Sequence, residues 1–143
     1  MKAERRIEQR TRSREQRTEN DRRRRKGDDI AKRMRSFAGA VLRLLPKLDH
    51  HFAAKHVARQ LARSATGGGS NYEEARGAES HADFIHKIRV AAKELREACY
   101  WLQLLEESGY LDDPRGLDAL IAEADELIAI LTASARTAKA RQR

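Results

Sequence analysis

The stretch "RSATGGGSNYEEARGAES", residues 63–80, places three consecutive glycines between two segments with helical periodicity. Three interpretations compete: a phosphate-binding loop, a flexible linker, and a patch of small side chains inside a helix. A P-loop needs a Lys after its last glycine and a strand before its first, and the sequence suggests neither. A flexible linker inside one small domain is uncommon. The residues alone therefore slightly favour a helix from about residue 49 to residue 76, with a neighbouring helix packed closely against the glycines.

Apolar residues on the N-terminal side of the glycines recur every three or four positions, which is typical of amphipathic helices. A first helix is expected from Asp28, and Pro46 should stop or kink it. Asp49 is a candidate N-cap for a second helix. The predicted core stripe of the first helix is Ile30, Met34, Phe37, Val41, Leu44 and Leu48, and that of the second includes Phe52, Val57 and Leu61.

Two further helices are expected after the glycines. Gly77 suits the end of the second helix, and Ser80 with Asp83 forms a capping box for a third helix that Gly109 closes. For the fourth helix, Asp113 is the expected N-cap and Pro114 the first helical residue. The predicted stripes are Phe84, Ile88, Ala92, Leu95, Cys99, Leu102 and Leu105, then Leu117, Leu120, Ile121, Ala124, Leu127, Ile128 and Leu131.

These four segments predict an all-α fold, an antiparallel up-down four-helix bundle of residues 28–135. The composition agrees, because a chain of 143 residues has only two prolines and can bury one core. No apolar run approaches the ~20 residues that cross a bilayer, and the N-terminus lacks the apolar part of a signal peptide. A single cysteine suits a reducing compartment, so we expect a cytoplasmic protein without a membrane partner.

Positive charge is concentrated at the two ends of the chain. Residues 1–26 hold 12 Lys and Arg against 5 Asp and Glu. With few apolar side chains, residues 1–27 are expected to be a flexible basic tail, although acid–base pairs such as Glu19–Arg23 favour helix. Residues 136–143 are expected to be a second basic tail. The candidate nucleic-acid-binding residues are Arg22, Arg23, Arg24, Arg25 and Lys26, which could neutralise phosphates or merely keep the tail soluble.

Evidence for catalysis or metal binding is weak. Asn71, Glu73, Glu74, Glu79 and Asp83 could suggest a carboxylate site, but hydrogen bonds from Asn71 and Glu74 to groups such as Arg63 are favoured. The histidines (His50, His51, His56, His81 and His86) lack the spacing of a shared metal site. No nucleophile–base pair is visible around Cys99. We therefore expect no catalytic residue, metal or cofactor.

Residues 61–111 resemble the family of proteins encoded in 23S rRNA intervening sequences. The matching positions are Arg63, Ser64, Thr66, Gly69, Asn71, Glu74, Ala75, Ser80, Asp83, Phe84, Tyr100, Trp101 and Leu102. The family usually has Ser where Gly67 stands and an aliphatic residue where Gly68 stands. The resemblance implies that the glycines lie within or near the second helix, in the bundle interior or a subunit interface.

The resemblance also implies a four-helix bundle that forms a homo-pentamer, and a distant similarity to the accessory proteins of diversity-generating retroelements. Those proteins bind nucleic acid and a reverse transcriptase. Arg63, Ser64, Asn71, Glu74, Tyr100 and Trp101 are then candidate structural or interface residues. The function expected is a non-enzymatic oligomer that binds RNA or DNA electrostatically. The alternative is a protein-interaction scaffold with no nucleic-acid role.

Overall fold

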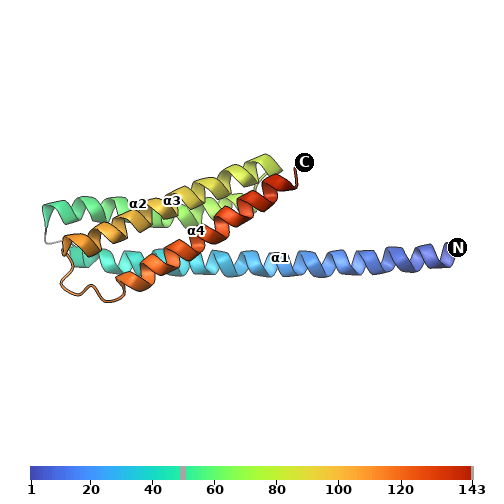
Figure 1. The fold of residues 1–143 in the computed structure, drawn as a ribbon, viewed down its shortest axis with the longest axis horizontal. Helices are drawn as coiled ribbons and strands as arrows, with labels where there is room; N and C mark the ends of the chain where they lie inside the picture. Colours follow the sequence, from blue (N-terminus) through green and yellow to red (C-terminus); the bar gives the residue numbers. More distant parts are fainter. Residues whose placement is uncertain (49–50, 143) are drawn as a thin grey trace. The chain divides into compact units, whose positions relative to one another are not determined.

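The computed structural model describes residues 1–48 and 51–142. Within them the chain is all-α, with no strand. The elements are α1 (Lys2–Leu44), the short 3-10 helix η1 (Leu45–Leu48), α2 (Phe52–Arg76), α3 (His81–Ser108) and α4 (Leu117–Ala140) (Figure 1). The chain divides into two compact units, Met1–Ile30 and Ala31–Arg143, and α1 contributes residues to both.

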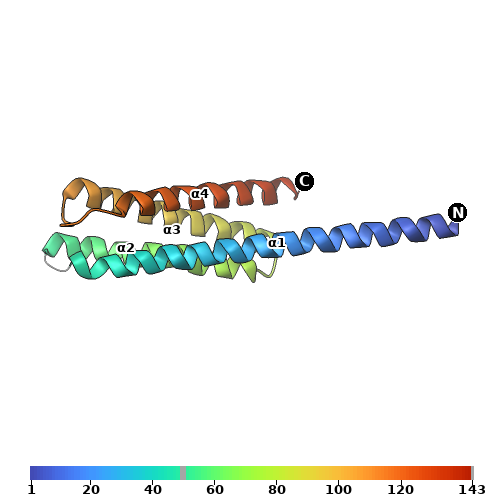
Figure 2. The same ribbon diagram turned by 90° about the horizontal axis from the view of Figure 1, so that it is seen from below.

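The second unit is a helical bundle with an aliphatic core. In it α3 packs between α2 and α4, along most of the length of each (Figure 2). The predicted stripes account for most of the core, and alanines add to it where helices approach closely. Fully buried side chains include Met34, Val41, Leu48, Leu61, Ile88, Leu95, Leu102, Leu105, Leu127 and Leu131. Burial of this apolar surface is the main force that holds the unit together.

Residues 31–44 of α1 join the bundle through polar as well as apolar contacts. The Arg33 guanidinium donates two hydrogen bonds to Glu123 of α4, at 2.8 and 2.9 Å, and its Nη2 lies 3.0 Å from Glu126. Arg35 lies 3.6 Å from Glu73 of α2. As predicted from Pro46, α1 ends at Leu44 and the proline lies in η1.

The three glycines lie inside α2, which is continuous from Phe52 to Arg76 and capped by Gly77. This confirms the small-residue interpretation and rules out the loop and the linker. A Cβ atom on Gly68 would lie 2.9 Å from Leu95 Cδ2, whereas one on Gly69 would lie 3.5 Å from Met34 Cβ. The missing side chains therefore let α2 approach α3 closely, and packing offsets the low helix propensity of glycine.

The predicted ends of α3 are confirmed. Ser80 is the N-cap, and its hydroxyl accepts a hydrogen bond of 3.0 Å from the Asp83 backbone N–H. Gly109 ends the helix with φ of 68°, a left-handed conformation that costs glycine little.

Both predicted ends of the fourth helix were wrong. The N-cap is Gly116, with φ of 91°, and not Asp113. Asp113 instead accepts hydrogen bonds from the backbone and the side chain of Arg115, while the Pro114 carbonyl accepts from the Leu117 N–H. At the other end α4 continues to Ala140, so most of the expected C-terminal tail is helical, because Ala138 adds a buried contact.

Two other predictions were wrong, and a third concerns a residue outside those that the structure describes. Phe52 is 94% exposed rather than part of the core, since it stands at the first position of α2. The N-terminal segment is helical from Lys2 and not a flexible tail. Its abundant Arg, Glu and Gln are good helix formers, and the expected Glu19–Arg23 pair is formed. The proposed cap Asp49 lies outside the described residues, as does His50.

Candidate functional site

The candidate nucleic-acid-binding residues lie on an exposed helical segment. Arg22, Arg23, Arg24, Arg25 and Lys26 are all exposed within α1. The first and last of five consecutive residues are about 400° apart around a helix axis, so these cations point in all directions from the segment. Arg23 pairs with Glu19. The segment thus presents a dense positive charge, which can neutralise phosphates without reading a base sequence.

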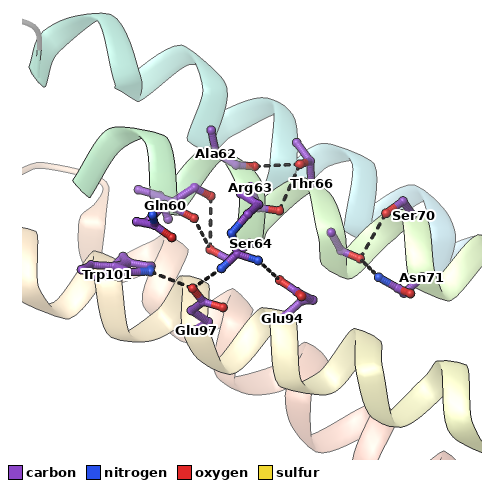
Figure 3. Close-up of polar contacts among 12 residues, drawn as sticks. Gln60, Ala62, Arg63, Ser64, Thr66, Ser70, Asn71, Glu94, Glu97 and Trp101 are labelled. Carbon is purple, nitrogen blue, oxygen red and sulfur yellow. Dashed lines mark hydrogen bonds and ion pairs between the residues drawn. The ribbon is translucent and has the colours of Figure 1, made fainter. Parts of the chain in front are cut away.

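Arg63 connects α2 to α3 through two carboxylates. Its guanidinium lies 3.3 Å from Glu94 and also pairs with Glu97 (Figure 3). The indole N–H of Trp101 donates to the same Glu97 at 3.4 Å. The hydrogen bond from Arg63, with a smaller contribution from Trp101, lowers the pKa of Glu97 below its ordinary value. The sequence-based prediction that Arg63 bonds Asn71 or Glu74 was therefore wrong. Arg63 pairs with α3 instead, because α3 presents two acids directly opposite it.

Asn71 and Glu74 have separate partners. The Asn71 amide donates to the Gly67 carbonyl at 2.8 Å (Figure 3), one turn earlier in α2. The Lys87 ammonium of α3 donates to Glu74 at 2.5 Å. Ser64 is fully buried, and its hydroxyl donates to the Gln60 carbonyl at 2.9 Å. These contacts support a structural role for the three residues, because they use their polar groups within the bundle.

Four aromatic side chains lie along neighbouring parts of α2 and α3. Tyr100 and Trp101 pack edge to face with ring centroids 5.0 Å apart, and Trp101 also meets His56 edge to face at 5.9 Å. Phe52 precedes His56 by one turn on the same face of α2. Tyr100 is 55% exposed and Phe52 94%. We call Phe52, His56, Tyr100 and Trp101 the aromatic surface.

The remaining reactive groups have structural explanations. Cys99 is buried, and its thiol donates to Asp125 at 3.5 Å. Burial and this neighbouring carboxylate raise the pKa of the thiol to about 11, so it is protonated and a poor nucleophile. His81 Nε2 donates to the Ala138 carbonyl at 2.6 Å. Within residues 1–48 and 51–142, no three His, Cys, Asp or Glu side chains are placed to hold a metal ion, and no helix has the length and apolarity that crossing a membrane requires.

One basic feature was missed in the sequence. A groove of about 710 Å³ lies between α3 and α4, lined by Arg89, Ala92, Arg96, Leu131, Thr132, Ala135, Arg136, Lys139 and Ala140. We call it the α3–α4 groove. Its four cations are scattered along the sequence and become neighbours only when the two helices pack. The sequence contains one weak indication of this basic groove, because residues 127–143 include cations but no acid.

Comparison with known proteins identifies the family. The sequence pattern of the 23S rRNA-intervening sequence proteins matches residues 27–133. The chain belongs to this family. The expected resemblance is therefore confirmed, and it covers most of the bundle but neither the end of α4 nor residues 1–26, which contain the arginine-rich segment.

A solved structure agrees with this assignment. It is a protein of unknown function from the S23 ribosomal protein family of Bacteroides thetaiotaomicron VPI-5482, determined at 1.70 Å. It is 29% identical to this chain with a TM-score of 0.71, and the similarity covers 78% of this chain and 98% of that one. None of the curated proteins compared with the chain matches it. Family and neighbour indicate no catalytic activity, and they leave the function of this member of the 23S rRNA-intervening sequence family open.

Proposed function

We propose that this protein is a non-enzymatic, self-assembling up-down bundle of the cytoplasm that binds RNA or DNA through its arginine-rich segment. The observation that carries the proposal is the run Arg22–Lys26, in which five consecutive cations are exposed on a helix. Each phosphate that such a segment neutralises releases a counterion, so binding should be salt-dependent and largely independent of sequence.

Self-assembly is supported by the aromatic surface. Large exposed aromatic side chains are enriched where proteins associate, and Phe52 and Tyr100 have little cover within one chain. The family resemblance implies a pentamer. The same surface favours the second candidate function, a scaffold that binds a protein such as a reverse transcriptase and uses its cations only for solubility.

Anisotropy of a labelled structured RNA and a matched DNA duplex, titrated with the full chain at several salt concentrations, tests the nucleic-acid proposal. Replacing Arg22 to Arg25 and Lys26 by Gln should weaken binding strongly and flatten the salt dependence. With duplex DNA, the log–log slope should fall by about 0.9 for each phosphate that the variant no longer neutralises. Binding that is absent at moderate salt would leave the scaffold as the better account.

Light scattering tests self-assembly. Tyr100→Glu places a charge on the aromatic surface and should lower the particle mass, because burying an unpaired charge is costly. His86→Glu is a matched control, since His86 is also exposed on α3 but precedes Tyr100 by 14 residues, about 21 Å along the helix axis. An unchanged mass for Tyr100→Glu would remove this residue from any subunit interface.

A further inference from the structure

The α3–α4 groove presents a positive charge that no acid balances. It contains Arg89 and Arg96 from α3 with Arg136 and Lys139 from α4, and no Asp or Glu lines it. All four cations are exposed. Among the ion pairs of the described residues, none includes these four side chains.

Four acids of α3 and α4 form ion pairs with arginines outside the groove. Glu94 and Glu97 of α3 face Arg63, and Glu123 and Glu126 of α4 face Arg33. After Glu126 the chain has no further acid. The lining of the groove therefore contains four cations and no acid that could pair with them.

The spacing of the cations suits an extended polyanion. Arg89 and Arg96 are seven residues apart, which is about 10 Å along the helix axis, and Arg136 and Lys139 face them across the groove. Duplex DNA presents about one charge per 1.7 Å of its axis, so several phosphates pass within this length. Three of the four cations are Arg, whose guanidinium can hold a phosphate through two parallel hydrogen bonds.

Helix-end stabilisation does not account for the whole arrangement. Arg136 and Lys139 lie near the C-terminus of α4, where cations are favoured by the helix dipole. Arg89 and Arg96, however, lie in the interior of α3, away from the C-terminus of their own helix. The floor of the groove is made of alanines, Leu131 and Thr132, without an aromatic ring on which a base could stack.

We propose that the α3–α4 groove is a second nucleic-acid contact, which holds the phosphodiester backbone without reading bases. The ligand class rests on the nucleic-acid binding proposed above, but the groove is a separate site. It combines Arg89 and Arg96 with Arg136 and Lys139. Arg136 and Lys139 lie beyond residues 27–133, the part of the chain that matches the family.

Three variants of the full chain, each lacking three cations, separate the two sites. The groove variant is R89Q/R96Q/R136Q, the segment variant is R22Q/R23Q/R24Q, and the control is K32Q/R43Q/R59Q, whose residues are exposed and do not line the groove. Binding to a labelled 20-base-pair DNA duplex is measured by anisotropy as a function of salt. The groove variant should bind at least tenfold more weakly than the control, with a log–log salt slope smaller by about 2 to 3.

The outcomes distinguish the proposals. Equal binding by the groove variant and the control, with a loss in the segment variant, would overturn the groove site and leave the segment site standing. The reverse pattern would overturn the segment site. If the wild-type chain binds labelled poly-glutamate through the groove but not the duplex, the occupant is an acidic protein and our assignment is wrong. No binding to either probe would overturn both proposals.

A second measurement uses the wild-type chain, so it does not depend on the folding of any variant. Lysine acetylation followed by mass spectrometry should show that the duplex protects Lys139 more than Lys32. Equal reactivity of Lys139 with and without a saturating amount of duplex would contradict the groove site.

Discussion

Gly68 of α2 lies so close to Leu95 of α3 that a Cβ atom at residue 68 would come within 2.9 Å of the Leu95 Cδ2 methyl. Leu95 is fully buried, so it has little room to move away. This contact explains why a helix with three consecutive glycines is stable here. The helix propensity that glycine forfeits is offset by close packing between α2 and α3.

Substitutions at neighbouring glycines should have opposite effects. Gly68→Val should lower the free energy of unfolding by about 1–3 kcal/mol, because it overpacks the interface with Leu95. Gly69→Ala should raise it, by up to about 1 kcal/mol, since the new Cβ meets Met34 at an ordinary distance and alanine favours helix. Denaturant unfolding at a defined protein concentration measures both. A stabilising Gly68→Val would contradict the close contact.

A double-mutant cycle tests whether the Leu95 side chain is what resists a larger residue at position 68. Leu95→Ala leaves space beside residue 68, so Gly68→Val should cost less in that background, with a coupling energy of about 0.5–3 kcal/mol. Strict additivity would show that the strain at residue 68 lies elsewhere.

The Arg63–Glu97 pair should make stability depend on pH. The folded state lowers the pKa of Glu97, so its contribution is present above the ordinary pKa and is lost as pH falls through the lowered folded-state value. Arg63→Gln should therefore lower the midpoint of thermal unfolding at pH 7, and the difference from wild type should shrink at acidic pH. Arg59→Gln, on an exposed residue of the same helix, is the control. A difference that stays constant with pH would count against the pair.

Glu106 of α3 and Asp118 of α4 should have the opposite pH dependence. A hydrogen bond shared with Asp118, together with its negative charge, raises the pKa of Glu106. Folding then favours the protonated carboxyl, so this contribution is full at acidic pH and is lost as pH rises through the raised value. Glu106→Gln should raise the thermal midpoint at pH 7, with no gain at acidic pH. Glu79→Gln removes an exposed acid elsewhere, and an equal gain from it would indicate a general charge effect.

Cys99 should be almost unreactive in the native protein. Burial raises the pKa of its thiol to about 11, so little thiolate is present at pH 8 and the sulfur is covered. A disulfide reagent should modify it much more slowly in the native state than in denaturant, where the thiol is free. Equal rates under the two conditions would show that the bundle opens readily around α3 and α4.

The sequence predicted the bundle because its helices carry strong periodic patterns and local end signals. Ser80, Asp83 and Gly109 act within a few residues of their own positions, so the ends of α3 could be inferred without tertiary information. The start of α4 could not, since Asp113 had two available partners and the turn at Arg115 and Gly116 used it. The partners of Arg63 were also missed, because a helix surface faces several neighbours and the sequence does not state which acid lies opposite.

The sequence by itself determined the all-α class, the family and the concentration of charge at the ends of the chain, since these depend on composition, periodicity and local motifs. Tertiary structure decided which interpretation of Gly67 to Gly69 holds, because a glycine is favourable inside a helix only when another helix packs against it. It also decided that Arg89, Arg96, Arg136 and Lys139 line one groove. Residues 40 to 50 positions apart become neighbours only through the packing of α3 against α4.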